Sequence, residues 1–308
     1  MAILHIGDEE RGRLWRQVFA RELPEADFRC APEEGDLADV RQLVAWTIPP
    51  GLIDRMPNLE VLFSIGAGID QLDIGAIPEG VRIVRMIEPG ITTTIAEYVA
   101  MAVLALHRDL PLYLAQQHAG HWQPQHTLLA RERAVGVMGM GELGVAVLSA
   151  LRGFEFQLSG WSRSARDVPG VKCFAGAGKL DAFLAASDIL VCMLPLTAET
   201  RGVLNRDLFA QLPRGARLVN VGRGGHLVQE DLLEALKSGQ LAAAVLDVTD
   251  PEPLPADHPL RYHPGVIVTP HVAGVTRHET AVYALLENVG RLARGMELEG
   301  EVDRTRGY

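Results

Sequence analysis

The segment Gly139-Met140-Gly141-Glu142-Leu143-Gly144 constrains the fold more than any other part of this chain of 308 residues. It follows an apolar run, residues 134–138, that has the length and composition of a buried strand. It opens a stretch, residues 142–151, whose apolar residues keep helical spacing, and a second apolar run at 155–161 completes a strand–helix–strand unit.

In this setting each glycine has a physical reason. Gly139 permits a tight turn, Gly141 lets the backbone approach a pyrophosphate, and Gly144 allows helix and strand to pack closely. The start of the helix offers free N–H groups to the phosphates. We therefore predict a dinucleotide-binding loop; the alternative is a turn that merely joins strand to helix.

Short apolar runs alternate with helical patterns on both sides of this loop, which predicts parallel sheets covered by helices. The length favours two domains. We predict an α/β protein with two doubly wound parallel-sheet domains, a Rossmann domain inserted into a flavodoxin-like one. The predicted boundaries are 1–97 with 273–308 for the outer domain and 98–272 for the inserted domain. A helix is predicted over 92–108, with Thr94 and Glu97 as a capping box, and an irregular crossing over 111–133.

The residues after the second strand of the unit bear on the choice of cofactor. A site for NAD usually has Asp or Glu there, to bind the ribose hydroxyls. This chain has Trp161-Ser162-Arg163-Ser164, with no carboxylate before Asp167. Arg163 can pair with a 2′-phosphate, and the two serines can donate hydrogen bonds to it. The turn predicts NADP(H) in preference to NAD(H); a solvated basic turn is the alternative.

Three downstream segments each place a reactive side chain just beyond a predicted strand. They contain Arg223 between glycines, Glu252 among prolines, and His271 in Thr269-Pro270-His271. Open α/β sheets bind ligands at the carboxyl ends of their strands. Singly, each has a structural alternative: a salt bridge, a surface loop, a satisfied histidine. Together, and in this order, they predict a reductase site.

The order of these segments resembles the D-isomer-specific 2-hydroxyacid dehydrogenases. The glycine loop, the Arg223-Gly224 pair, the Glu252-Pro253-Leu254-Pro255 run and the Thr269-Pro270-His271 run carry the resemblance, which covers essentially the whole chain. Within that family the chain is most similar to the bacterial glyoxylate/hydroxypyruvate reductases, on the turn 161–164 and the tail 302–308. The resemblance is looser in the first hundred residues.

The resemblance implies NADPH-dependent reduction of small 2-keto acids, such as glyoxylate and hydroxypyruvate, to 2-hydroxy acids. Arg223 would bind the substrate carboxylate and polarise the keto oxygen. His271 would donate a proton to that oxygen as hydride reaches C2, and Glu252 would orient the imidazole and favour its charged form. Ala67 and Gly68, in the segment 65–70, would hold the carboxylate through backbone amides. Trp46 would line the pocket; a core tryptophan is the alternative.

Further cofactor contacts follow from the same resemblance. The residues concerned are Leu194, Pro195, Thr200, Val221, Gly222 and Asp247, the last at the nicotinamide amide. Gly222 and His226 depart from the family pattern, in which many members have alanine before the arginine and an aliphatic residue at the position of His226. We expect this departure to alter the pocket or the substrate preference without abolishing the chemistry.

The charge and the remaining motifs restrict the partners. The net charge of −10 argues against nucleic acid and anionic membranes as partners. The apolar stretch near Val99–Leu106 is too short to span a bilayer, and residues 1–7 lack the pattern of a secretory signal, so we expect a cytoplasmic protein. The three cysteines are expected to be free thiols. No metal site is expected, although His118, His121 and His126 lie close together in the sequence.

The sequence also allows an expectation about the oligomeric state and leaves two alternative functions open. The family resemblance implies a homodimer. One alternative function is reduction of a larger 2-keto acid, because the pocket wall comes largely from the first domain. The other is a noncatalytic nucleotide-sensing corepressor, which would keep the same fold.

Overall fold

The computed structural model describes residues 2–304, and the chain divides into two compact units. Unit 1 comprises Met1–Ile91 with Val275–Tyr308, and unit 2 comprises Thr92–Gly274. Residues 305–308 of the tail that supports the family resemblance lie outside the described residues.

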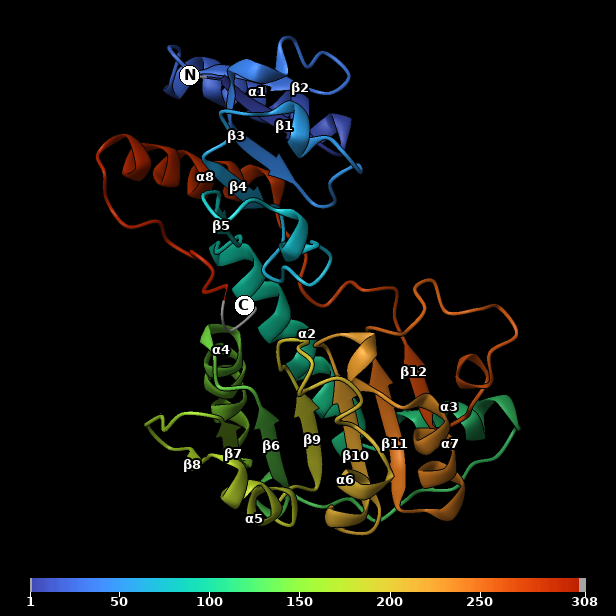
Figure 1. Ribbon diagram of the computed structural model, residues 1–308. Helices are drawn as coiled ribbons and strands as arrows, with labels where there is room; N and C mark the ends of the chain where they lie inside the picture. The colour runs from blue at the N-terminus through green and yellow to red at the C-terminus, as the bar shows by residue number, and fades with distance from the viewer. Residues whose placement is uncertain (1, 305–308) are drawn as a thin grey trace. The chain divides into compact units, whose positions relative to one another are not determined.

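Unit 1 contains a parallel sheet of five strands in the order β2-β1-β3-β4-β5 (Figure 1). The strands are β1 (Ala2–Ile6), β2 (Asp27–Cys30), β3 (Val40–Ala45), β4 (Val61–Ser64) and β5 (Arg82–Val84). This order is that of flavodoxin-like folds. Helix α1 (Glu9–Glu22) packs against α8 (His278–Ala293), where the Trp15 indole donates to His278 O at 2.8 Å. The last helix therefore packs within unit 1.

Unit 2 contains a parallel sheet of seven strands in the order β12-β11-β10-β9-β6-β7-β8. The strands are β6 (Ala134–Met138), β7 (Gln157–Ser162), β8 (Lys172–Ala175), β9 (Ile189–Cys192), β10 (Ala216–Asn220), β11 (Leu241–Leu246) and β12 (Val266–Val268). The helices are α2 (Pro89–His107), α3 (Leu110–His118), α4 (Glu142–Leu151), α5 (Leu180–Leu184), α6 (Arg206–Gln211) and α7 (Gln229–Ser238). The predicted fold class, two doubly wound parallel sheets, is confirmed.

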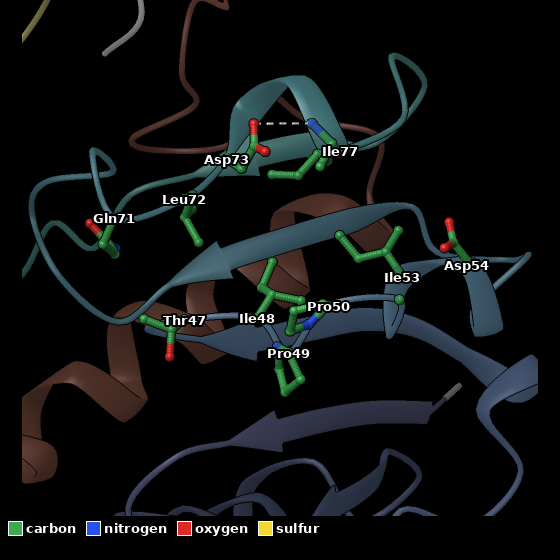
Figure 2. A pocket seen from close by; sticks show the side chains of 12 residues that line it. Thr47, Ile48, Pro49, Pro50, Ile53, Asp54, Gln71, Leu72, Asp73 and Ile77 are labelled. Atoms are coloured by element: carbon green, nitrogen blue, oxygen red, sulfur yellow. Dashed lines mark hydrogen bonds between the residues drawn. The ribbon is translucent and has the colours of Figure 1, made fainter.

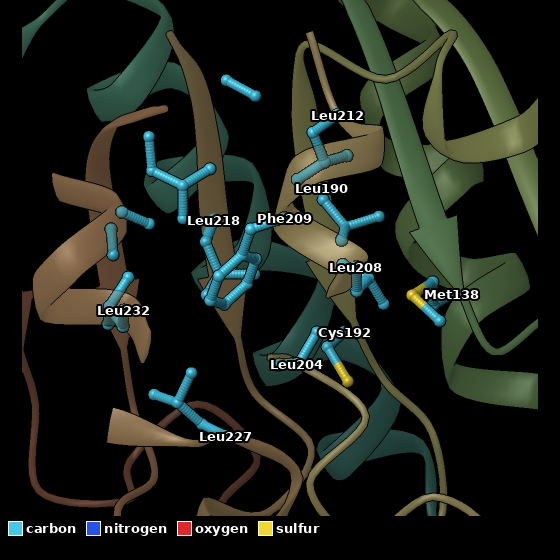
Figure 3. Packing of buried hydrophobic residues seen from close by; sticks show 14 of the residues in the cluster. Met138, Leu190, Cys192, Leu204, Leu208, Phe209, Leu212, Leu218, Leu227 and Leu232 are labelled. Atoms are coloured by element: carbon cyan, nitrogen blue, oxygen red, sulfur yellow. The ribbon is translucent and has the colours of Figure 1, made fainter. Parts of the chain in front are cut away.

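The core of unit 2 has two layers because side chains alternate along each strand. In β6, Met138 joins a cluster beneath α5, α6 and α7, whereas Val137 joins one beneath α2 and α4. Figure 3 shows the first cluster, in which Phe209 and Leu208 of α6 pack among leucines of the sheet. A sheet buried on both faces explains why its strands have nearly continuous apolar runs.

Two strands were missed and two helical predictions were partly wrong. The edge strands β2 and β8 are short and include charged residues, so they lack an apolar run. Helix α2 begins at Pro89 and not at residue 92, because the buried carboxylate of Glu88 accepts the N–H groups of Gly90 and Ile91. The predicted irregular crossing contains helix α3.

Helix α2 is longer than the apolar stretch seen in the sequence. It has 19 residues and a mean hydropathy of 1.4, so by length and composition alone it could cross a membrane. Length and composition are weak grounds for a span, since core helices also meet them. Val99, Ala102, Val103 and Leu106 of α2 are fully buried in the unit 2 core.

Candidate active site

The carboxyl ends of neighbouring strands are aligned, which places the predicted reactive residues along one edge of the unit 2 sheet. Asn220 pairs with Leu246, and Leu246 pairs with Val268, at the carboxyl ends of β10, β11 and β12. Arg223, Glu252 and His271 follow these three neighbouring strands. Met138, just before the glycine loop, pairs with Cys192, which pairs with Asn220, so the glycine loop lies at the same edge.

The predicted acid and its orienting carboxylate are in direct contact. His271 Nδ1 lies 2.9 Å from Glu252 Oε2, and Glu252 Oε1 accepts the N–H of Thr249 at 2.9 Å. The two side chains are 36% and 38% exposed. With Nδ1 held by the carboxylate, Nε2 is the ring atom left for proton exchange with a substrate.

The buried residue Asp247 fixes the loop that carries His271 through hydrogen bonds. His271 has a positive φ of 55°, which is costly for a non-glycine residue. Its N–H donates to Asp247 O at 2.8 Å. The Asp247 carboxylate, 2% exposed, accepts the N–H groups of Val272 and Ala273 and the hydroxyl of Thr269. Asp247 thus stabilises the strained loop through both carboxylate oxygens, while its contact with nicotinamide stays a prediction.

The Arg223 turn is fixed by the end of its own strand. Asn220 donates through Nδ2 to Arg223 O at 3.1 Å and accepts the N–H of Gly222 at 3.2 Å. The Arg223 guanidinium donates to Gly222 O at 2.8 Å, and the side chain is half-buried. A Cβ on Gly224 would lie 2.0 Å from the backbone of Thr249, so only glycine lets this turn meet the segment that leads to Glu252.

The glycine loop has the geometry that a pyrophosphate requires. Gly139 has a φ of +106°, and a Cβ on Gly144 would lie 1.9 Å from Gly139 O. A Cβ on Gly141 would meet nothing within 4 Å. Gly141 is also the N-cap of α4, which no side chain of the described residues caps. Met140, Glu142 and Leu143 complete the loop and the first turn of α4, and these residues fit a phosphate-bearing cofactor.

The turn that follows β7 presents its basic and hydroxyl groups to solvent. Arg163, Ser164 and Arg166 are exposed, and the Ser162 hydroxyl donates to Ser164 O at 2.8 Å. A hydrogen bond from Thr197 lowers the pKa of Glu199, and the charge of Arg163 lowers it further, so that carboxylate lies close enough to Arg163 to interact. Trp161 is anchored through its indole N–H to Gly176 O at 3.0 Å.

The other predicted cofactor residues are placed by backbone bonds around the same edge. The Thr200 hydroxyl donates to Pro195 O at 2.7 Å and accepts the N–H of Thr197 at 2.8 Å, which closes the loop after β9. Leu194 and Val221 are buried, with exposed fractions of 8% and 7%. They can offer a ligand little beyond their backbone.

The predicted carboxylate-binding loop of unit 1 is folded around Ser64. The Ser64 hydroxyl accepts the N–H of Gly66 and also contacts Gly68 O at 3.2 Å. Within residues 2–304, the N–H groups of Ala67 and Gly68 have no hydrogen-bond acceptor. A Cβ on Gly66 would lie 2.2 Å from the Trp46 ring, so the loop packs directly on Trp46, which is 38% exposed.

A cavity of about 570 Å³ lies in unit 1 between two segments that follow β3 and β4. Figure 2 shows Ile48, Pro49, Pro50 and Ile53 on one side, and Leu72 and Ile77 on the other. Gln71, Asp54 and Asp73 add polar groups to its lining. The sequence did not predict this cavity, because no single segment forms it.

The buried thiol of Cys192 lies at the carboxyl end of β9, next to Asn220 of β10. Burial raises the pKa of the Cys192 thiol to about 12, so it stays protonated beside the site. The described residues contain no group of three or more His, Cys, Asp and Glu side chains placed to hold a metal ion. The arrangement can bind an anion, hold a cofactor and transfer a proton.

Sequence reasoning missed two residues that support the site from inside. The Tyr98 hydroxyl, on α2, is hydrogen-bonded to Thr269, and burial raises the pKa of this phenol. His226 is fully buried and contacts the backbone of Arg223. His226 was noted only as a departure from a family pattern, and Tyr98 is 171 positions from its partner, so no local signal marks it.

Comparison with known proteins yields a family and several close relatives. The profile described as "D-isomer specific 2-hydroxyacid dehydrogenase, NAD binding domain" matches residues 100–273. Glyoxylate/hydroxypyruvate reductase A of Yersinia enterocolitica is 37% identical over 300 residues, which cover 96% of each chain.

Two solved structures share the fold along the whole chain. A D-isomer-specific 2-hydroxyacid dehydrogenase from Xanthobacter autotrophicus Py2, in complex with NADPH and MES, has a TM-score of 0.94 and 38% identity, covering 100% of this chain and 99% of that one. The NADPH-dependent glyoxylate/hydroxypyruvate reductase of Sinorhizobium meliloti, with NADP and sulfate, has a TM-score of 0.90 and 36% identity, with the same coverage.

Proposed function

The chain belongs to the D-isomer-specific 2-hydroxyacid dehydrogenase family, and we propose that it reduces glyoxylate and hydroxypyruvate to glycolate and D-glycerate with NADPH. The single observation that carries the proposal is the 2.9 Å contact between His271 Nδ1 and Glu252, at the sheet edge that also bears Arg223 and the glycine loop. A nucleotide-sensing corepressor has no need of an oriented proton donor, so this pair favours an enzyme.

NADPH is the proposed cofactor on two grounds. Gly139, Gly141 and Gly144, with the start of α4, would hold its pyrophosphate, and Ser162, Arg163 and Ser164 would hold the 2′-phosphate. The relatives from Xanthobacter and Sinorhizobium were solved with NADPH and NADP, which supports the same choice here. When bound, NADPH supplies hydride to C2 of the keto acid.

The side chains of this chain perform the remaining chemistry. The Arg223 guanidinium binds the substrate carboxylate and polarises the keto oxygen. His271, protonated, gives the proton on Nε2 to the keto oxygen as C2 becomes tetrahedral. Glu252 holds the proton on Nδ1. The ring, 36% exposed, recovers its lost proton from solvent.

The test is a panel of 2-keto acids assayed with NADPH and with NADH. We expect turnover with glyoxylate and hydroxypyruvate and a higher kcat/KM with NADPH. Tight NADPH binding without turnover of any 2-keto acid would contradict the proposal and favour the sensor. An equal or better kcat/KM with NADH would contradict the choice of NADPH and leave the proposed reduction of 2-keto acids standing.

A larger 2-keto acid is the second candidate substrate, and the cavity of unit 1 favours it. Its lining includes Thr47, next to Trp46, and Gln71, which donates to the loop residue Ser64 at 3.1 Å. A long apolar substituent on the keto acid would find room there. Higher kcat/KM for branched or aromatic 2-keto acids than for glyoxylate would establish this alternative.

We also propose a homodimer formed through the segment 101–129 of unit 2. This segment exposes large apolar side chains, which monomers seldom gather in one stretch. They are Met101, Leu110, Leu112, Leu114, Leu129 and Trp122, the last 99% exposed. A second copy is the proposed occupant because the family resemblance implies a dimer. Sedimentation analysis tests this, and Trp122→Glu should shift the protein toward monomer. A cytoplasmic location stays a prediction.

A further inference from the structure

His226 is a fully buried histidine in the turn that carries Arg223. It ends the short 3₁₀ turn Gly224–His226, where its N–H donates to Arg223 O at 3.2 Å. Its own carbonyl accepts the N–H of Leu204 at 2.8 Å. The backbone of His226 is therefore committed to the turn, and its ring is held inside unit 2 with an exposed fraction of 0%.

The two ring nitrogens of His226 contact two different segments. Nδ1 lies 3.0 Å from the backbone nitrogen of Arg223, and Nε2 lies 3.2 Å from Pro195 O. A backbone N–H can only donate, and a carbonyl oxygen can only accept. The ring must therefore accept at Nδ1 and donate at Nε2, which defines a neutral tautomer with its proton on Nε2.

The ring also explains the glycine that precedes Arg223. A Cβ on Gly222 would lie 2.9 Å from His226 Nδ1 and 3.0 Å from Cε1. The imidazole thus fills the space that an alanine side chain at position 222 would need. Gly222 and His226 therefore pack directly against each other.

We propose that His226 is a positioning residue, whose ring fixes the backbone of Arg223 to Pro195 and so presents the guanidinium to the substrate carboxylate in one orientation. The inference rests on the proposed function, because it requires that Arg223 bind the keto acid. Pro195 belongs to the loop assigned to the cofactor and is also bonded to Thr200 at 2.7 Å. His226 therefore connects the Arg223 turn to Pro195, which the Thr200 hydroxyl also holds.

Three substitutions of His226 separate positioning from simple packing. His226→Leu removes both ring contacts, and His226→Gln can reach Pro195 O but supplies no acceptor near Arg223 N–H. His226→Asn keeps an oxygen near the position of Nδ1. We expect Leu and Gln to raise the KM for glyoxylate and to lower kcat/KM roughly 10- to 100-fold, the cost of a misplaced binding group. Asn should restore part of this loss, because it keeps the contact with Arg223 N–H but not the contact with Pro195 O.

The matched control is His263→Leu. His263 Nδ1 also accepts a backbone N–H, that of Gly265, at 3.1 Å, but it precedes β12 and has no contact with the Arg223 turn. We expect its kinetics to equal those of the wild type. NADPH affinity, measured by fluorescence titration, should change little in any variant, because the Thr200 hydroxyl still holds Pro195 and the glycine loop is untouched.

The outcomes distinguish this inference from the proposed function. Wild-type turnover with an unchanged KM in His226→Leu and His226→Gln would overturn the inference alone. Equal losses in Leu, Gln and Asn, with parallel losses of NADPH affinity and melting temperature, would show a merely structural role and overturn it too. If His226→Leu fails to fold, the KM values of His226→Asn and His226→Gln test the inference, and equal values would overturn it. No wild-type turnover of any 2-keto acid would overturn both proposals.

Discussion

Two glycine-rich loops lie along one edge of the unit 2 sheet, and they differ in the space around their central glycines, Gly141 and Gly224. In the loop of residues 139–144, Gly141 faces open space, since a Cβ there would meet nothing within 4 Å. In the turn of residues 222–225, a Cβ on Gly222 would meet His226, and one on Gly224 would meet the backbone of Thr249. The first loop leaves room for a ligand, whereas the second is filled by the protein itself.

The difference in free space suits the two loops to different functions. An open loop with free N–H groups suits a cofactor whose phosphates complete its contacts. A crowded turn suits a side chain that must be held in one orientation before the substrate arrives. Substitutions in the open loop should therefore affect cofactor binding, whereas substitutions in the crowded turn should affect substrate binding and stability.

The largest effect is expected from His271→Ala, which removes the proton donor without touching either loop. The kcat with glyoxylate should fall roughly 10²- to 10⁴-fold, the usual contribution of general acid catalysis. NADPH affinity should stay at the wild-type value in a fluorescence titration. Near-normal turnover would remove His271 as the acid.

Arg223→Ala removes the guanidinium that the crowded turn is proposed to hold toward the substrate carboxylate. Loss of charge-assisted hydrogen bonds to the carboxylate should raise the KM for glyoxylate roughly 10²-fold. The dissociation constant for NADPH should change little, because Arg223 lies outside the open loop. An unchanged KM in steady-state kinetics would count against carboxylate binding by this residue.

Gly224→Ala and Gly141→Ala form a matched pair for the two loops. The first forces a Cβ to within 2.0 Å of Thr249, and overpacking of this kind should lower the free energy of unfolding by about 1–3 kcal/mol. The second should change stability by less than about 1 kcal/mol and weaken NADPH binding about tenfold. Denaturant unfolding and cofactor titration measure the pair. Equal destabilisation of both variants would contradict the division.

Arg163→Ala should have the smallest effect, on cofactor preference. Loss of the 2′-phosphate contact should reduce the ratio of kcat/KM for NADPH to that for NADH about tenfold. Arg214→Ala is the control, because Arg214 precedes β10, is exposed, and donates to Ser238 O. A ratio that moves equally in both variants would show that Arg163 has no specific role.

The sequence predicted the parts of this site that depend on local order. Gly139, Gly141 and Gly144 lie within six residues of one another, and Glu252 and His271 each follow a strand with a clear apolar run. Parallel strands then bring their carboxyl ends together, so order along the chain is enough to assemble the edge.

What the sequence could not predict depends on contacts across the fold. Asp247 supports the His271 loop from 25 and 26 positions away, and His226 meets Pro195 across 31 positions. The cavity of unit 1 needs two segments to face each other. The cap on α2 was missed because Glu88 lies outside the apolar pattern and also accepts from Thr280, 192 positions away.

In the proposed reaction, hydride reaches C2 of a 2-keto acid from NADPH while His271 supplies the proton. The most direct measurement uses NADPH with deuterium at both C4 positions, glyoxylate, and NMR or mass spectrometry of the product. We expect the wild type to form glycolate with one deuterium on C2, and His271→Ala to form the same product roughly 10²- to 10⁴-fold more slowly. Glycolate without deuterium, or no product from any 2-keto acid, would contradict it.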